Sequence, residues 1–145
     1  MSTEVRHDAA GGELAPNYFH HTLANGLQLV GQRMASLASV TFGVQVPGGI
    51  KDEPDAQLGL TSLLSEMVFQ GTEQRNVRQL TEDFEAIGAR KGGEAGTEFA
   101  RYSAQVVHNR LDRALELIAD VVLHPLFPAD EFVQMRNVQL QEIRR

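Results

Sequence analysis

The chain has 145 residues, of which 42% are apolar and 22% are charged, so it can bury one sizeable core and little more. Its formal net charge is −6 and its basic residues stand mostly singly, which argues against a nucleic-acid partner. The absence of cysteine excludes disulfides, thiolate zinc ligands and cysteine nucleophiles. No apolar run approaches the roughly 18 residues that span a bilayer, so we expect no membrane segment and a cytoplasmic protein.

The N-terminal part of the chain is expected to form an arm followed by a hairpin. Residues 1–17 are polar and aperiodic, which is typical of a flexible arm. Apolar segments at 19–23 and 27–34 flank Asn25-Gly26, a dipeptide that tolerates the positive φ angles of a tight turn. This pattern predicts a β-hairpin.

A third strand and two helices are predicted next. Apolar and smaller residues alternate over 40–46, as on a half-buried strand, until Pro47-Gly48-Gly49 breaks the pattern. Between Leu58 and Phe69 apolar residues recur at three- and four-residue spacing, which predicts a helix that buries one face. A second helix is framed by Asn76 as its N-cap and by Gly88 at its end.

The remaining segment returns to strands and then to helices. Residues 89–107 contain a predicted turn at Gly92-Gly93 and a longer strand from Glu98 to Val107. A third helix is expected from Arg110 to Leu123, and a fourth from Pro128 to the terminus. No capping residue closes the fourth helix, so the C-terminus is interpreted as a truncation point.

The order of these elements predicts the fold class. Strands and helices occur in blocks, which favours an α+β fold in which a mixed or antiparallel sheet carries helices on one face. We expect residues 18–145 to form this module, preceded by the arm.

The most informative segment runs from Gly59 to Thr72 and reads G-L-T-S-L-L-S-E-M-V-F-Q-G-T. It closely resembles the active-site helix of the insulinase/pitrilysin family of zinc metallopeptidases, which includes mitochondrial-processing-peptidase-like proteins and reads G-x-x-H-F-L-E-H-M-x-F-x-G-T. The residues that shape the helix and its end match this motif, whereas the residues at the zinc-ligand and general-base positions differ. The first ligand position holds Ser62, the general-base position Ser65 and the second ligand position Glu66. The family's third ligand, a glutamate about 76 residues further on, matches Glu142.

Other segments support this resemblance, which covers roughly residues 18–143. Residues 22–27 are similar to the family's T-L-x-N-G-L opening, and Ile87-Gly88-Ala89 to the start of its I-G-(A/G) strand pair. Residues 115–127 and 138–143 are similar to its A-L-x-x-L-x-D-x-x-x-x-P-x-F and V-x-x-E-I stretches. The resemblance implies a fragment of the N-terminal module, because family members contain two or four longer modules that enclose a chamber for peptides.

The zinc chemistry of that family is not supported by the residues present. Zinc hydrolases bind the metal through histidine or carboxylate and lower the pKa of bound water to about 7 beside a carboxylate base. None of the five histidines forms an i, i+4 pair, so we expect no zinc, no other cofactor and no catalytic residue. Glu66 and Glu142 are expected to be partly buried. Two readings of this pair stay open: the carboxylates bind a magnesium or calcium ion, or they are simply hydrogen-bonded or solvated.

Three residues near or on the long strand are candidate contacts for a peptide: Thr97, Arg101 and Tyr102. Arg101 and Tyr102 are most simply a solvent-facing and a core-facing neighbour. An edge strand at this position would also be able to pair with an extended peptide.

Two functions remain open. The first is a non-catalytic pseudo-peptidase that binds peptide, or that completes a chamber with a zinc-bearing paralogue, as the resemblance to heterodimeric family members implies. The alternative is a zinc- or other metal-dependent endopeptidase in which a longer protein carries the working site. A severed module would also expose part of its sheet or helices, so self-association of the fragment is a further expectation.

Overall fold

A computed structural model describes residues 17–143, with side chains through residue 141. The predicted arm therefore lies outside the described residues, apart from Asn17. The chain divides into two compact units, one ending at Ala38 and one beginning at Ser39, and each is described by itself. Within the described range, no helix combines the length and the apolar character needed to cross a membrane.

The first unit contains the predicted hairpin. β1 (Tyr18–Thr22) pairs antiparallel with β2 (Gln28–Gln32). Asn25 Oδ1 accepts a hydrogen bond from the Leu27 amide at 3.1 Å, and Gly26 adopts a φ of 87°, which glycine tolerates because it has no Cβ. The hairpin prediction and its Asn-Gly turn are confirmed.

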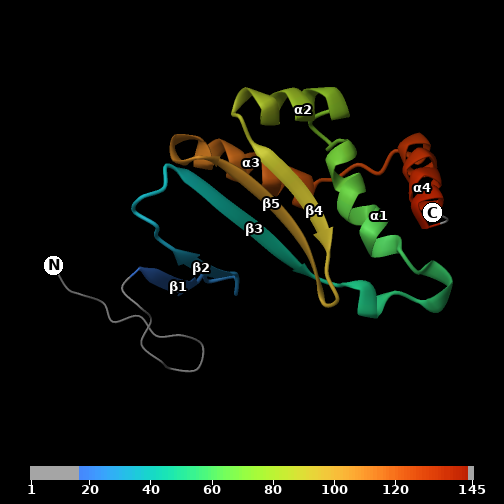
Figure 1. Cartoon of the computed structure of the whole chain (residues 1–145), viewed down its shortest axis with the longest axis horizontal. Helices are drawn as coiled ribbons and strands as arrows, with labels where there is room; N and C mark the ends of the chain where they lie inside the picture. The colour runs from blue at the N-terminus through green and yellow to red at the C-terminus, as the bar shows by residue number, and fades with distance from the viewer. Residues whose placement is uncertain (1–16, 144–145) are drawn as a thin grey trace. The chain divides into compact units, whose positions relative to one another are not determined.

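The second unit is built on a three-stranded antiparallel sheet (Figure 1). β3 (Ser39–Pro47) and β4 (Arg90–Ala95) both pair with β5 (Phe99–Val107), which lies between them. Burial alternates along β5, so that one face of the sheet carries the core and the other is largely polar. The residues of β5 on the core face are Ala100, Tyr102, Ala104 and Val106.

The helices of this unit are α1 (Leu60–Met67), α2 (Val77–Ala86), α3 (Leu111–Leu123) and α4 (Ala129–Ile143). α1 packs against β4 and α3 packs against β5. The α+β class and the antiparallel pairing are therefore confirmed.

The predicted ends of α2 are also confirmed. Asn76 Oδ1 accepts a hydrogen bond from the Gln79 amide at 2.9 Å, and Gln79 Oε1 accepts one from the Asn76 amide at 3.1 Å. This reciprocal capping box satisfies two amides that the helix itself leaves without partners. Gly88 follows the helix with a φ of 63°.

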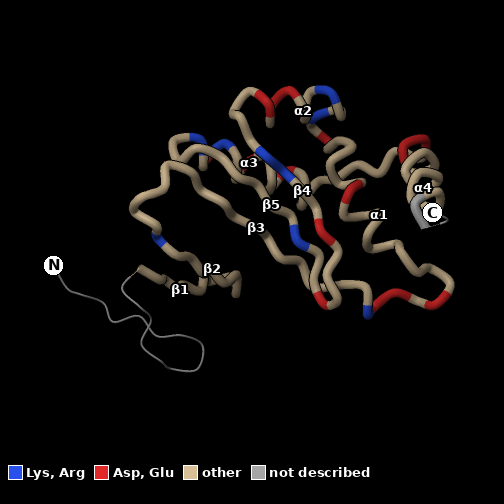
Figure 2. Tube along the Cα trace, viewed as in Figure 1, with Lys and Arg blue, Asp and Glu red and all other residues tan. Residues whose placement is uncertain are grey.

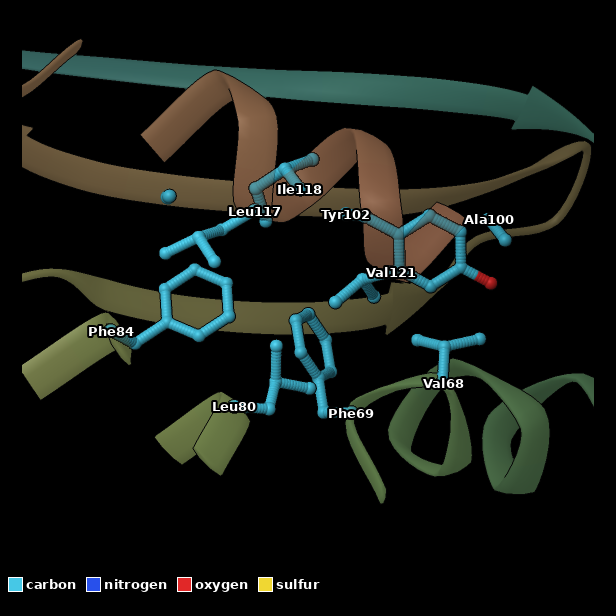
Figure 3. Packing of buried hydrophobic residues seen from close by; sticks show 10 residues of the cluster. Val68, Phe69, Leu80, Phe84, Ala100, Tyr102, Leu117, Ile118 and Val121 are labelled. Carbon is cyan, nitrogen blue, oxygen red and sulfur yellow. The ribbon is translucent and has the colours of Figure 1, made fainter. Parts of the chain in front are cut away.

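An aromatic cluster stands at the centre of the core (Figure 3). The Phe69 ring meets Phe84 and Tyr102 edge to face, with centroid separations of 6.3 and 6.4 Å. Leu80 and Leu117 beside them are completely buried. The cluster thus joins α2, α3 and β5 to the turn that follows α1.

One predicted turn is wrong. Gly92-Gly93 lies inside β4, and the β4–β5 turn comes later, where the Gly96 amide donates to the Phe99 carbonyl at 2.9 Å. The local signal misleads because Gly93 is required for close packing against α1, as described below.

Candidate functional site

The start of α1, the helix that carries the motif, is held by a carboxylate from outside the helix. Glu53 accepts hydrogen bonds from the Gly59 amide at 2.8 Å and from the Thr61 amide at 2.6 Å. These bonds, those from Thr61 first, lower the pKa of Glu53 from its ordinary value of 4.5. Figure 2 shows acidic residues along the segment between β3 and α1. A negative charge here also complements the positive end of the helix.

The middle of α1 is pressed against β4. A side chain at Gly93 would collide with the carbonyl group of Ser65, so the helix backbone approaches the strand more closely than any other residue at position 93 would allow. Ser65 is 3% exposed, and its Oγ donates to the Ser62 carbonyl at 2.8 Å. The hydroxyl at the general-base position is therefore buried and already engaged within the helix.

The two ligand-like positions of α1 lie in different surroundings. Ser62 is half-buried, whereas Glu66 is exposed, between the buried residues Ser65 and Met67. The expectation that Glu66 is partly buried is wrong, because the buried stripe of the helix is formed by its neighbours. Glu142 lies on α4, and its side chain is outside the described residues.

The residues on α1 do not fit a zinc ion. Glu66 supplies one carboxylate, but Ser62 and Ser65 supply only hydroxyls, whereas zinc is bound by imidazole, thiolate or carboxylate groups. The Ser65 hydroxyl is also already bonded to the Ser62 carbonyl. Across the described residues, no group of three histidine, aspartate or glutamate side chains is placed to hold a metal ion. The described histidines stand on other elements: His20 and His21 on β1, His108 after β5 and His124 after α3.

The strand that carries two of the candidate peptide contacts is not an edge strand. β5 pairs with β3 on one side and with β4 on the other, so its backbone is used in both ladders. Tyr102 is a core residue, and burial raises its pKa. Arg101 is exposed on the other face of the sheet, and Thr97 is exposed in the β4–β5 turn.

A partly buried ion-pair network that sequence reasoning missed fixes the segment after α1. Asp120 on α3 is 7% exposed and accepts hydrogen bonds from the Thr72 hydroxyl at 2.7 Å and from the Arg75 guanidinium. Arg75 Nε also donates to Asp83 on α2 at 2.9 Å, and Arg113 on α3 contacts the same carboxylate. The hydrogen bond to Asp83, followed by that to Asp120, raises the pKa of Arg75. Arg75 thus connects α2 and α3.

A cleft of about 300 Å³ opens beside the N-terminal half of α1. Its lining is mostly apolar and comes from β3, β5 and α1, including Val46, Leu64 and Tyr102, together with the acidic residues Asp52 and Glu53. Ser62, Ser65 and Glu66 are not among the residues that line it in the described structure. The motif positions and the cleft are therefore separate features of the helix.

Comparisons with known proteins agree with the motif on α1. The family model described as insulinase (peptidase family M16) matches residues 30–145. The chain belongs to the insulinase family. It is 32% identical over 130 residues to the probable mitochondrial-processing peptidase subunit beta of Arabidopsis thaliana. That alignment covers 90% of this chain and 24% of the Arabidopsis protein. It is 29% identical over 124 residues to an uncharacterized zinc protease of Bacillus subtilis, covering 86% and 30%.

Solved insulinase-family structures share the fold. A peptidase M16 inactive domain from Pseudomonas fluorescens matches with a TM-score of 0.77 and 25% identity, over 87% of this chain and 31% of that one. A protease from Helicobacter pylori matches with a TM-score of 0.78 and 24% identity, over 90% and 31%. The chain thus spans between 24% and 31% of the length of these four proteins.

Proposed function

We propose that this chain is a non-catalytic insulinase-family module. The main support for this proposal is that Ser65 occupies the general-base position. Its hydroxyl is buried and donates to the Ser62 carbonyl. A serine hydroxyl does not replace the carboxylate that activates a metal-bound water, because its pKa is far too high for it to act as a base at neutral pH. Both histidine positions are changed as well, so metal binding and base catalysis are lost together.

We propose further that the module acts with a zinc-bearing paralogue. The Arabidopsis relative is named as a subunit, and the Pseudomonas structure is named as an inactive domain. These names support the proposal that an inactive module of this family works together with another module. In such a heterodimer the partner would supply the zinc site, and this chain would contribute surface to the peptide chamber.

A peptide-binding role for this module is supported by the outer edge of β4. No strand within the described residues pairs with that edge. Exposed amide and carbonyl groups on an edge strand can bind an extended peptide by adding it to the sheet. β4 therefore replaces β5 as the strand expected to bind peptide. Of the three candidate residues, Thr97 lies in the β4–β5 turn, whereas Arg101 and Tyr102 pair with Glu94 and Gly93 on the inner side of β4, away from its outer edge.

The alternative function is that of a metal-dependent endopeptidase in a longer protein. It is favoured by the names of relatives, since the proteins from Bacillus subtilis and from Rickettsia felis, the latter 31% identical over 127 residues, are called zinc proteases. Under this alternative a second module of the same protein would hold the working site.

Peptide hydrolysis by wild type and by a restored variant tests whether this chain by itself is non-catalytic. We expect wild type not to cleave an unstructured peptide in the presence of zinc. The variant Ser62→His/Ser65→Glu/Glu66→His rebuilds the family pattern and should gain zinc, and Glu142→Gln in that background should weaken the gain. Zinc-dependent cleavage by wild type that is abolished by Glu142→Gln, and kept by the surface control Glu85→Gln, would refute the proposal.

A further inference from the structure

The cleft beside α1 plays no part in the proposed function. It measures about 300 Å³, at the lower end of the usual range for ligand sites, which suits a molecule built on a single ring. Val46 of β3 and Leu64 of α1 are half-buried in its walls. An apolar group in the cleft would remove the rest of these side chains from water, which is favourable. The walls therefore favour a ligand with a small apolar body.

A hydroxyl in this cleft is free to bond to a ligand. Tyr102 lines the cleft and is 8% exposed, yet within the described residues its hydroxyl has no hydrogen-bond partner. Figure 3 shows its oxygen pointing away from the Phe69 and Phe84 rings. The oxygen is not sealed in the core, since Asp120 Oδ1 is the only sealed side-chain atom without a partner in the described part of the chain. Because tyrosine hydroxyls that are mostly buried usually find a partner, we expect a ligand to supply one.

The charge of the cleft selects the head group of that ligand. Asp52 and Glu53 line the cleft, and none of its lining residues in the described structure is basic. Glu53 is already bonded to the amides of Gly59 and Thr61, where it offsets the partial positive charge of the helix start. Asp52 Oδ2 accepts a hydrogen bond from the Gly49 amide at 3.1 Å, whereas Oδ1 has no partner within the described residues. The negative charge of Asp52 therefore favours a cation.

We propose that this cleft binds small amphipathic amines, with the apolar body against β3 and α1 and the ammonium group beside Asp52. An ammonium carries three N–H donors, and both the Asp52 carboxylate and the Tyr102 hydroxyl accept hydrogen bonds. A primary amine with one aromatic ring matches the volume of the cleft, its apolar walls and the sign of its charge. The site uses none of the motif positions on α1, so it does not depend on the proposed function.

Titration of the 145-residue chain with three probes of similar shape tests the proposal: 2-phenylethylamine, 2-phenylethanol and 3-phenylpropionate. Backbone amide shifts in ¹H–¹⁵N NMR spectra, at about 0.1 M ionic strength to screen distant charges, report both affinity and location. We expect the amine to bind with a Kd on the order of 1 mM and to shift Thr61, Leu64 and Ala100. The alcohol should bind about threefold more weakly, as expected for loss of an exposed ion pair, and the acid more weakly still. An amine that binds no better than the alcohol, or that shifts only residues outside the cleft, would overturn the proposal.

Three variants identify the contacts, with circular dichroism to establish that each keeps the fold. Asp52→Asn should weaken the amine about threefold and leave the alcohol unchanged, because it removes the charge and keeps an acceptor for the Gly49 amide. Asp55→Asn is the matched control, since its exposed carboxylate does not line the cleft, and neither probe should change. Tyr102→Phe keeps the ring and should weaken the amine about threefold through loss of one hydrogen bond. If Asp55→Asn weakens the amine as much as Asp52→Asn, or if Tyr102→Phe changes nothing, the proposal is wrong.

Discussion

The carbonyl group of Ser65 in α1 lies where a side chain at Gly93 of β4 would project. This contact sets the distance between the motif helix and the sheet. It involves backbone atoms on the helix side, so it cannot be relieved by a change of rotamer. The position of Ser62, Ser65 and Glu66 relative to β4 therefore depends on the absence of a side chain at residue 93.

Gly93→Ala is predicted to lower the free energy of unfolding by about 3 kcal/mol, near the upper end of the range for overpacking, because the methyl group meets backbone rather than a flexible side chain. Urea denaturation followed by circular dichroism measures the change.

The matched control for this substitution is its neighbour. A Cβ at Gly92 would meet nothing within 4 Å, and Gly92 does not require a positive φ. Gly92→Ala should therefore be neutral or stabilising by about 0.5 kcal/mol, since alanine loses less conformational freedom on folding. Equal effects at the two positions would show that α1 does not approach β4 as described.

Arg75→Met is predicted to destabilise the chain by about 3 kcal/mol. The substitution keeps the apolar stem and removes the guanidinium, which leaves the 7%-exposed carboxylate of Asp120 with only the Thr72 hydroxyl and the distant imidazole of His124, 3.6 Å away. Thermal unfolding of wild type and variant measures the loss.

Arg78→Met serves as the control for Arg75→Met. Arg78 pairs with Glu82 on α2, where the two side chains are 86% and 59% exposed, so its loss should cost about 0.5 kcal/mol or less. If the two variants lose similar stability, the network around Asp120 does not fix the segment after α1.

Glu53→Gln is predicted to destabilise the chain in a pH-dependent manner. The pKa of Glu53 is lower in the folded chain than its ordinary value of 4.5, because the Thr61 and Gly59 groups donate to the charged carboxylate. The stabilisation is therefore fully present above pH 4.5 and is lost as the pH falls through the folded pKa. Urea titrations between neutral and acidic pH should show wild type and variant converging at the acidic end.

Glu85→Gln, on the exposed surface of α2, controls for the removal of one negative charge in this experiment. A difference between wild type and Glu53→Gln that stays constant across the whole pH range would contradict the capping role of the Glu53 carboxylate.

Local signals in the sequence were sufficient for several elements. Asn25-Gly26 and the Asn76 cap act through bonds within a few residues, so the hairpin and the start of α2 follow from residue type and spacing. The alternation over β3 and β5 likewise reflects burial of one face of a strand.

Features that depend on distant contacts could not be predicted in the same way. Gly92-Gly93 has the local signature of a turn, and only its contact with Ser65 explains why it lies in a strand. The central position of β5 depends on which strands pair, and the bond between Arg75 and Asp120 joins segments far apart in the chain. The resemblance placed Ser65 at the base position, but only the structure shows that its hydroxyl is engaged.

The most direct test of the non-catalytic assignment is the zinc content of the wild-type chain. The protein is equilibrated with zinc, dialysed extensively and measured by elemental analysis, beside the variant Ser62→His/Ser65→Glu/Glu66→His. We predict far less than one zinc per wild-type chain, because α1 offers two hydroxyls and one exposed carboxylate in place of two imidazoles and a base. One zinc per wild-type chain, retained through dialysis, would contradict the account.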